Sequence, residues 1–311
     1  QSADIGHVPS YGKDPYTEKA ICLFKETLGD DIEVYFVYNG TAANTLGLKA
    51  VTRSHHAIIC ADTAHIVSHE VGAPVSLIGC MLLPVASHQG KISAEAIDEA
   101  YQNAAFWGRH ANKPKVVSIA QSTELGTVYS IQELKQISAV CKKHDLIFHM
   151  DGCRLANAAV ALNVSLKALT AEVGVDVLSF GGTKNGLLFG EAIIFFRKTL
   201  ADEFEYLQKQ CLQLQSKMRF LSVQFIPYLE DKLWEKNARH ANDMCARLSA
   251  GLTKVVSVRL AFPVETNQLF AYFPKAMIAP TQALFPYYVW DEKTSLVRLV
   301  TSFDTTSEEV D

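Results

Sequence analysis

The sequence has neither a long hydrophobic run nor an excess of charge of one sign. Apolar stretches such as residues 192–196 and 81–86 fall far short of the roughly 18 residues needed to span a bilayer. Lysine and arginine number 29 against 33 aspartates and glutamates, a net charge of −4, and no long run of one sign occurs. A membrane-spanning chain and a basic surface for nucleic acid or anionic membranes are therefore excluded.

Cysteine is sparse and scattered. The seven cysteines are odd in number and never closer than twelve positions, which disfavours a disulfide framework and zinc-ligand spacing. We therefore expect free thiols, no bound metal and a cytoplasmic protein. The chain also lacks repeats and any linker rich in proline and glycine, so its parts are expected to share an interface. With 49% apolar residues, the 311-residue chain can form a substantial core.

Short apolar runs alternate with helical patterns over the first two thirds of the chain. This alternation predicts an α/β fold with a mainly parallel sheet covered on both faces. The expected strands are 33–38, 57–60, 115–120, 146–150, 175–180 and 192–196, and the clearest helices are 42–51 and 131–144. From about residue 198 the pattern predicts long helices over 200–230 and 231–252, then strands within 257–273 and 287–302. We expect a large domain over 1–205 and a smaller C-terminal α+β domain over 206–311.

Polar groups follow several expected strands, at the edge where parallel sheets gather their ligands. The string NGTAAN (39–44) turns through Gly40 into a helix. Its free N–H groups and the Thr41 hydroxyl suit a phosphate, although an ordinary capped turn explains the string equally well. HMDGCR (149–154) places Asp151 at the end of a buried strand, beside Arg154. It fits either an Asp-Gly turn or an ionised carboxylate that binds a protonated ring nitrogen.

Two further strand ends carry a lysine and a histidine. SFGGTKNG (179–186) places Lys184 among small residues after a buried strand, where a lysine is costly unless it is used. The glycines let a cofactor approach, and a buried amine suits nucleophilic chemistry; the alternative is a lysine extending to solvent from a flexible loop. ADTAH (61–65) ends on His65, with Glu70 five residues on. This imidazole either stacks on an aromatic cofactor or is an ordinary surface or core residue.

Taken together, these strings resemble a known family. A phosphate-binding turn, a stacking histidine, a strand-end Asp151 and Lys184 follow one another as in fold type I pyridoxal phosphate enzymes. The chain resembles the aromatic amino acid β-eliminating lyase/threonine aldolase family. The matching strings are HVPSYGKDPYTEKA, VYFVYNGTAANTLGLKA, HIVSHEVGAP, QSTELGTVYS, HMDGCRLANA, DVLSFGGTKNGLLFGEAIIFF, SKMRFLS and LVRLVTSFDT. The resemblance implies the pyridoxal phosphate-dependent transferase fold of type I.

The resemblance also implies roles for the strand-end residues toward pyridoxal 5′-phosphate. Lys184 would bind the cofactor covalently, Asp151 would pair with its pyridinium nitrogen, and His65 would stack on its ring. The phosphate would be held by Gly40, Thr41 and Thr183.

Substrate contacts are implied in the same way. Arg154 would lie near the cofactor's 3-oxygen and the carboxylate of an amino acid substrate, which Arg298 would bind with both ends of its guanidinium. Tyr11 would lie near the substrate. Lys217 and Arg219 would approach the phosphate of a neighbouring subunit.

One string departs from the better-known bacterial branch of the family. That branch has Thr-His-Asn-Gly where this chain has TELG (123–126), so Glu124 replaces a histidine that faces the substrate β-carbon. The base for the β-hydroxyl is then Glu124, His65 through a water, or a water held by the phosphate. Cys153 replaces the usual alanine, a change we expect to be structural.

The activity implied is cleavage of L-threonine or L-allo-threonine to glycine and acetaldehyde. A phenylserine-type aldolase or a β-eliminating lyase on the same fold is the main alternative. A nucleotide-binding oxidoreductase and a catalytically silent binding protein are two remoter ones. A homotetramer built as a dimer of dimers is implied. Similar proteins continue before HVPSYG and after SFDTT, so we expect this chain to be trimmed at both ends, with TTSEE (305–309) opening a helix.

Overall fold

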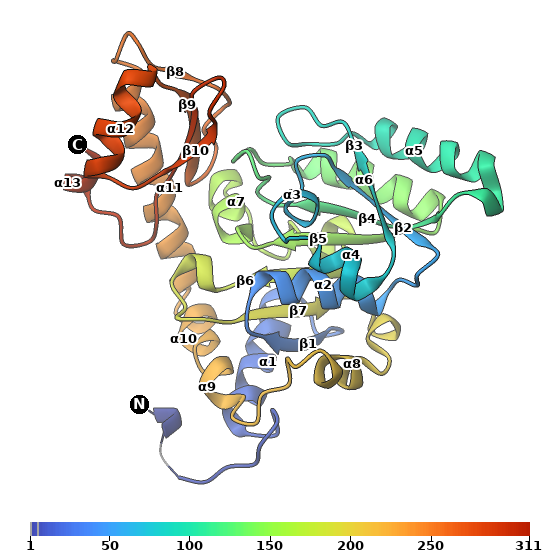
Figure 1. Cartoon of the computed structure of the whole chain (residues 1–311). Helices are drawn as coiled ribbons and strands as arrows, with labels where there is room; N and C mark the ends of the chain where they lie inside the picture. The colour runs from blue at the N-terminus through green and yellow to red at the C-terminus, as the bar shows by residue number, and fades with distance from the viewer. Residues whose placement is uncertain (1, 5) are drawn as a thin grey trace.

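The computed structural model describes residues 2–4 and 6–311. Its larger sheet has seven strands in the order β1-β7-β6-β5-β4-β2-β3. The pairs β2–β3, β2–β4, β4–β5 and β5–β6 are parallel, while β7 runs antiparallel to β6 and β1. The expected mainly parallel sheet is confirmed (Figure 1). The strands are β1 (Glu33–Val37), β2 (His56–Ala61), β3 (Met81–Val85), β4 (Lys113–Ala120), β5 (Ile147–Gly152), β6 (Val177–Gly181) and β7 (Glu191–Phe195).

Helices cover both faces of this sheet. Gly47 of α2 lies against Val177 of β6, whereas the ring of Phe180 contacts Phe24 of α1 and Phe225 of α10. Residues 177 and 180 point to opposite faces because side chains alternate along a strand. The helices and short 3-10 turns are η1 (Ser2–Asp4), α1 (Pro15–Leu28), α2 (Gly40–Ala50), α3 (His65–Ser68), α4 (Ala73–Ile78), α5 (Ala94–Trp107), η2 (Gly108–His110), α6 (Ile131–Lys143), α7 (Leu155–Leu162), η3 (Ala171–Val173), η4 (Thr183–Asn185), η5 (Lys198–Ala201), α8 (Phe204–Gln210), α9 (Arg219–Ser222), α10 (Phe225–Glu230), α11 (Leu233–Leu252), α12 (Lys275–Leu284) and α13 (Ser307–Val310).

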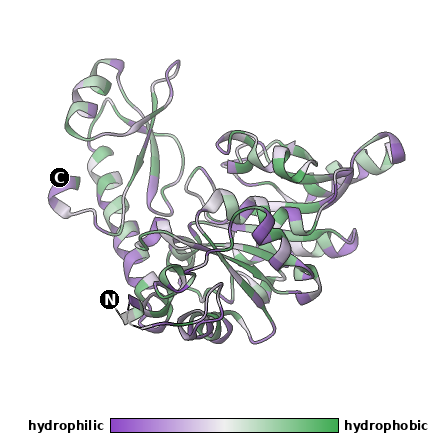
Figure 2. Ribbon diagram, turned by 60° about the horizontal axis from the view of Figure 1, so that its bottom comes forward, coloured by the Kyte–Doolittle hydropathy of each residue, from purple (hydrophilic) through white to green (hydrophobic). Residues whose placement is uncertain are grey.

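Helix α1 illustrates how the local sequence sets these elements. Asp14 caps its N-terminus by accepting hydrogen bonds from the backbone N–H groups of residues 16 and 17, and Pro15 takes the first helical position. The ring of Phe24 on its buried side packs 5.1 Å from Phe180 and 5.3 Å from Phe225. Hydrophobic residues line the sheet and hydrophilic ones the outer helical surfaces (Figure 2). No helix within the described ranges is long and apolar enough to cross a membrane.

The long helix expected over 200–230 is wrong. The chain instead forms α8, α9 and α10, and Leu212 between α8 and α9 has a left-handed φ of 64°. The interruption lets two glutamines reach the edge strand β1 and its end. Gln208 Nε2 donates to Phe36 O at 2.8 Å, and Gln213 Oε1 accepts from Tyr38 N at 3.0 Å. These bonds satisfy backbone groups that have no neighbouring strand, so tertiary contacts override the helical pattern.

The C-terminal part of the chain forms a second sheet. It is antiparallel, in the order β10-β11-β9-β8, as expected from the residues near 257–273 and 287–302. Its strands are β8 (Arg259–Leu260), β9 (Gln268–Tyr272), β10 (Tyr288–Asp291) and β11 (Leu296–Val300). Thr306 caps α13 in a capping box with Glu309, as the TTSEE string predicts.

The two sheets have separate cores that meet along α11. The core of the large sheet continues to Ala238, and the core of the small sheet includes Cys245. The boundary expected near residue 205 stays a prediction. The change of core between these two residues leads us to propose a boundary within α11.

Candidate active site

The carboxyl ends of four neighbouring strands carry residues that the sequence singles out. Asp151 lies near the end of β5, and Lys184 lies in η4 directly after β6. Glu124 follows β4, and His65 opens α3 after β2. Because parallel strands end at the same edge of a sheet, the topology brings all four residues to that edge. The strands β6, β5, β4 and β2 that carry them lie in one sheet (Figure 1).

Both carboxylate oxygens of Asp151 accept hydrogen bonds. Asn44 Nδ2 donates to Oδ2 at 2.8 Å, and the backbone N–H of Cys153 donates to Oδ1 at 3.0 Å. Burial opposes ionisation, but the charge of Lys184 and these hydrogen bonds outweigh it and lower the pKa of Asp151. The carboxyl is therefore ionised at neutral pH and suited to hold a protonated ring nitrogen.

His65 is held by a buried carboxylate. Its Nδ1 lies 2.8 Å from Glu70 Oε1. This hydrogen bond raises the pKa of His65 above its ordinary value, although burial opposes the shift. Glu124 and Asp151 raise this pKa further and Lys184 lowers it, so all three charges act on the imidazole.

Asn44 and Glu70 connect His65 to Asp151. Glu70 Oε1, which bonds His65, also accepts from Asn44 Nδ2 at 3.0 Å, and Asn44 bonds Asp151 in turn. Asn44 Oδ1 and Glu70 Oε2 are buried and have no hydrogen-bond partner within the described part of the chain. Sequence reasoning quoted both residues without assigning them a role. The available signal was a polar residue in the second turn of a helix that packs on the sheet.

The turn that carries Lys184 is fixed on both sides. Before it, the backbone N–H of Gly182 donates to Glu191 Oε2 at 2.6 Å. After it, Asn185 Nδ2 donates to Tyr228 Oη at 2.8 Å and to a backbone carbonyl of α11 at 2.9 Å. Burial raises the pKa of Glu191 to about 7, against the hydrogen bond from Gly182. Glu191 was missed from the sequence, where it stands as a lone carboxylate opening the apolar run AIIFF.

The N-terminus of α2 lies beside the segment that follows Asp151. A Cβ on Gly40 would be 2.9 Å from the Cys153 sulfur, so this first helical residue has little space for a side chain. Asn39 caps the helix by accepting from Ala42 N at 2.9 Å. The positive end of the helix, with Thr41 as its second residue, therefore faces the strand-end cluster, where an anion is stabilised. Thr183 opens η4, and its hydroxyl lies 3.4 Å from Gly190 O.

Arg298 comes from the second sheet, on β11. Its guanidinium lies 5.5 Å from the ring of Trp290, and its Nε and Nη2 bond Gln268 Oε1 at 3.2 and 2.7 Å. Burial and then the like charge of Arg154 lower the pKa of Arg298 to about 10, while Glu124 opposes the shift. Two arginines whose charges act on each other suit a carboxylate held between them.

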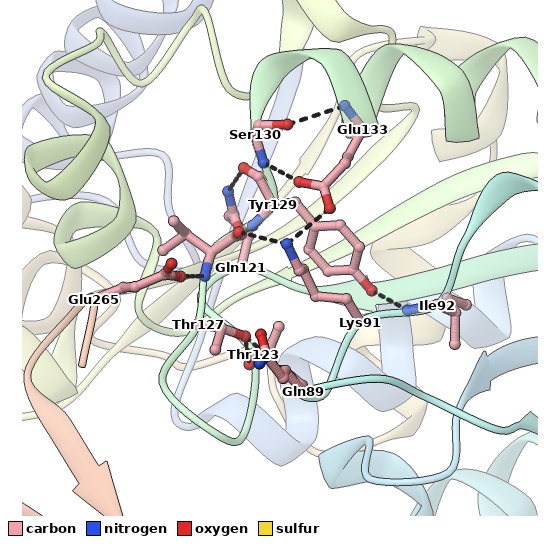
Figure 3. A network of polar contacts seen from close by, with 11 residues as sticks. Gln89, Lys91, Ile92, Gln121, Thr123, Thr127, Tyr129, Ser130, Glu133 and Glu265 are labelled. Atoms are coloured by element: carbon pink, nitrogen blue, oxygen red, sulfur yellow. Dashed lines mark hydrogen bonds and ion pairs between the residues drawn. The ribbon is translucent and has the colours of Figure 1, made fainter. Parts of the chain in front are cut away.

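The loop that carries Glu124 is held by a polar network (Figure 3). The side-chain amide of Gln121 bonds the backbone of Tyr129 twice, at 2.9 and 3.0 Å. Thr123 and Thr127 hydroxyls lie 2.7 Å apart. The side chains of residues 265 and 266, just before β9 of the second sheet, bond the backbone of residues 128 and 126 at 2.7 and 2.9 Å. Glu124 is itself buried, so the loop presents a carboxylate in a fixed position.

Three weaker predictions lie apart from this cluster. Tyr11 is half-exposed. Its backbone N–H donates to Ser216 O at 2.9 Å, and the Lys209 ammonium lies 5.0 Å from the centre of its ring. Lys217 is exposed, and Arg219 Nη1 donates to the carbonyl of residue 6 at 3.2 Å. In the described part of this one chain, none of these contacts reaches the strand-end cluster.

The residues at this edge fit pyridoxal phosphate. The helix N-terminus at Gly40 suits a phosphate, and the ionised Asp151 suits a protonated pyridine nitrogen. His65 offers a flat ring, and Lys184 an amine for covalent attachment. The fit rests on the buried Asp151 carboxylate and on Gly40, where a Cβ would fill the narrow space between the start of α2 and Cys153.

Comparisons with known proteins show which family this chain is similar to. The profile of the beta-eliminating lyase family matches residues 1–276. The low specificity L-threonine aldolase of Pseudomonas sp. (strain NCIMB 10558) is 45% identical over 271 residues, 87% of this chain and 78% of that protein. The low specificity L-threonine aldolase of Pseudomonas aeruginosa is 43% identical over 99% of this chain and 89% of its own length. The solved threonine aldolase of Leishmania major is 33% identical, with a TM-score of 0.93 over 99% of this chain and 90% of that one.

Sheet topology, site and structural likeness define a pyridoxal phosphate enzyme fold of type I. Within that class, the chain belongs to the beta-eliminating lyase family, whose profile covers most of its length. The resemblance seen in the sequence is therefore confirmed, as is the fold class.

Proposed function

We propose that this protein is a pyridoxal phosphate-dependent aldolase that cleaves L-threonine and L-allo-threonine, and related β-hydroxy amino acids, to glycine and an aldehyde. The observation that carries the proposal is the convergence of Asp151, Lys184 and Glu124 with Arg298 at one edge of the sheet. Relatives named L-threonine aldolases support the substrate class.

Six residues would hold the cofactor: Lys184, Asp151, His65, Gly40, Thr41 and Thr183. Bound pyridoxal phosphate supplies the electron sink for the charge left on the substrate Cα when the Cα–Cβ bond breaks. Asp151, whose pKa lies below the ordinary value, would stay ionised and would hold the ring nitrogen in its protonated form. His65 would stack on the ring of the bound cofactor.

The two arginines orient the amino acid. The charges of Arg298 and Arg154 act on each other, and a substrate carboxylate bound between them would remove much of their mutual repulsion. With the carboxylate fixed there, the hydroxyl-bearing substituent is directed toward the Glu124 loop. Orientation of the breaking bond is worth a large rate factor, because a small misplacement of reacting groups is costly.

We propose Glu124 as the base that accepts the proton of the β-hydroxyl. The hydrogen bond that His65 donates to Glu70 raises the pKa of His65 and so favours its protonated form, which cannot accept a proton. Glu124 lies in a buried, hydrogen-bonded loop close enough to act on both His65 and Arg298. Positioned proton transfer of this kind contributes roughly 10²- to 10⁴-fold in rate.

A steady-state comparison of L-threonine, L-allo-threonine and phenylserine tests the proposal, with glycine and the aldehyde as the measured products. Lys184→Ala is expected to abolish turnover, and full activity in this variant would refute the role of Lys184. The family's name also favours a β-eliminating lyase, which would release ammonia and a 2-oxo acid in place of glycine. A phenylserine-type aldolase would show its highest kcat/KM with phenylserine.

We further propose a cytoplasmic homo-oligomer assembled as a dimer of dimers. Apolar side chains exposed on the described surface near the site support an interface: Val71, Leu77, Leu188, Phe189 and Leu212. Such residues gather where subunits meet. Light scattering of the purified protein measures the assembly directly, and a monomer at micromolar concentration would refute it.

A further inference from the structure

A single buried amide joins the arginine of the substrate site to the loop of the proposed base. Gln268 opens β9 and is fully buried. Its Oε1 accepts from Arg298 Nε at 3.2 Å and from Nη2 at 2.7 Å. Its Nε2 donates to Thr123 O at 2.9 Å, directly before Glu124. Both ends of the amide are therefore bonded to elements that bear substrate-binding groups.

The strand register explains this contact. Arg298 pairs with Phe270 across β11 and β9, and Gln268 lies two residues before Phe270, on the same face. Trp290 of β10 lies on the guanidinium at 5.5 Å. A guanidinium has five N–H donors, of which Gln268 takes one on Nε and one on Nη2. Among the described residues the other three donors, two on Nη1 and one on Nη2, stay available, and one from each nitrogen can face a carboxylate side by side.

The loop approaches β9 closely at a second point. Gly126 has a φ of +83°, and a Cβ there would be 2.7 Å from Gln268 O and 2.9 Å from its Cγ. The hydroxyl of Thr266 donates to Gly126 O at 2.9 Å. Only glycine fits this conformation and this spacing without strain. The Gln268 amide is thus part of a tight contact between the small sheet and the loop.

We propose that Gln268 is a positioning residue, which fixes Arg298 relative to the Glu124 loop so that the substrate carboxylate and β-hydroxyl meet their partners together. The proposal rests on the proposed function. Gln268 touches neither the substrate nor the reacting bond; it acts through Arg298 and through the carbonyl of residue 123. Losing it frees the guanidinium and loosens the loop.

The test compares Gln268→Met, which keeps the side-chain length and removes both hydrogen-bonding ends, with the wild-type holoenzyme. We expect KM for L-threonine to rise about tenfold and kcat to fall at least fivefold. Glycine has a carboxylate but no β-hydroxyl, so its binding tests the contact with Arg298 separately from the contact with the Glu124 loop. Its dissociation constant, measured from the visible absorbance of the loaded protein, is expected to rise about tenfold.

Asn267 provides a matched control on the same strand edge. It is also a buried amide, with Nδ2 donating to Thr301 O at 2.8 Å. Asn267→Leu is expected to lower the melting temperature, as Gln268→Met does, but to leave the KM for threonine and glycine affinity within twofold. Equal kinetic effects in both variants, or none in Gln268→Met, would overturn the positioning role.

A second variant keeps the proposal testable where Gln268→Met is too unstable. Gln268→Glu retains an acceptor for Arg298 and loses the donor to Thr123, so kcat is expected to fall at least fivefold; a wild-type kcat refutes the proposal. If the wild-type protein binds glycine but does not cleave threonine, the proposed function fails. The glycine dissociation constants of the variants then still decide the role of Gln268.

Discussion

Replacing Glu191 by glutamine tests how the Lys184 turn is held. Glu191 is almost fully buried, and its Oε2 accepts the Gly182 N–H at 2.6 Å. Glutamine keeps an oxygen acceptor of the same reach and removes the ionisable proton. The substitution therefore changes the charge at this position with little change in shape.

The size of the expected change in the free energy of unfolding follows from the pKa of Glu191. Burial raises it to about 7 from an ordinary value of 4.5, so the folded protein binds this proton more tightly than the unfolded chain. Stability is thus lost as pH rises from about 4.5 through 7. A tenfold change in proton affinity is worth 1.36 kcal/mol, so ionising Glu191 costs the fold about 3 kcal/mol at pH 8. Glu191→Gln is expected to recover an increment of this order at pH 8 and almost none at pH 4.

Urea unfolding at a series of pH values measures the effect. The variant's free energy of unfolding, relative to wild type, should rise between pH 4.5 and 7 and then level off. Glu133→Gln is the control of opposite sign, because the Lys91 hydrogen bond overcomes burial and lowers the pKa of Glu133. That variant should lose stability relative to wild type as pH rises. A Glu191→Gln difference that stays constant from pH 4 to 8 would refute the reasoning.

Three further predictions concern single hydrogen-bonding groups. Arg298→Lys, which loses the planar donor pair, is expected to raise KM for L-threonine at least tenfold in steady-state assays, and an unchanged KM would contradict the carboxylate site. Glu70→Gln is expected to lower the pKa of His65, because the Glu70 hydrogen bond is the main cause of its increase; NMR titration of that ring is the measurement, with an unshifted curve as the contrary result. Ser130→Ala removes the α6 cap and is expected to cost about 1 kcal/mol in urea unfolding, whereas a loss below about 0.3 kcal/mol would argue against the cap.

The sequence predicts those parts of the site that depend on strand ends. Asp151 and Lys184 follow apolar runs that can only be buried strands, and a parallel sheet brings such ends to one edge. The structure also confirms the strands of the second sheet and the cap of α13. In each case a local pattern is sufficient, because the neighbours that matter are fixed by strand order.

Other parts could not be predicted, because their partners come from distant segments. Asn44 and Glu70 meet only because α2 packs against α4 and the segment before it, and Glu191 reaches Gly182 only through antiparallel pairing of β6 and β7. The break between α8 and α9 depends on the unpaired edge of β1, which no helical periodicity reveals. The partners of buried polar side chains are thus a tertiary property, even where the residue types stand out in the sequence.

The two sheets carry different parts of the proposed site, one for the cofactor and one for the substrate. A substitution at Gly126 tests whether the two parts act independently. The large sheet positions Asp151 and Lys184, the proposed cofactor ligands, whereas β9 and β11 position Arg298, the proposed substrate ligand. Gly126→Ala adds a Cβ 2.7 Å from Gln268 O at a φ of +83°, so the loop and the small sheet must move apart. We expect it to cost more than about 1 kcal/mol of stability and to raise the KM for threonine several-fold. Because the contact does not involve Asp151 or Lys184, the dissociation constant of pyridoxal phosphate, followed by fluorescence quenching, should stay within twofold. A parallel loss of cofactor affinity would show that the two halves are mechanically coupled and would refute this division.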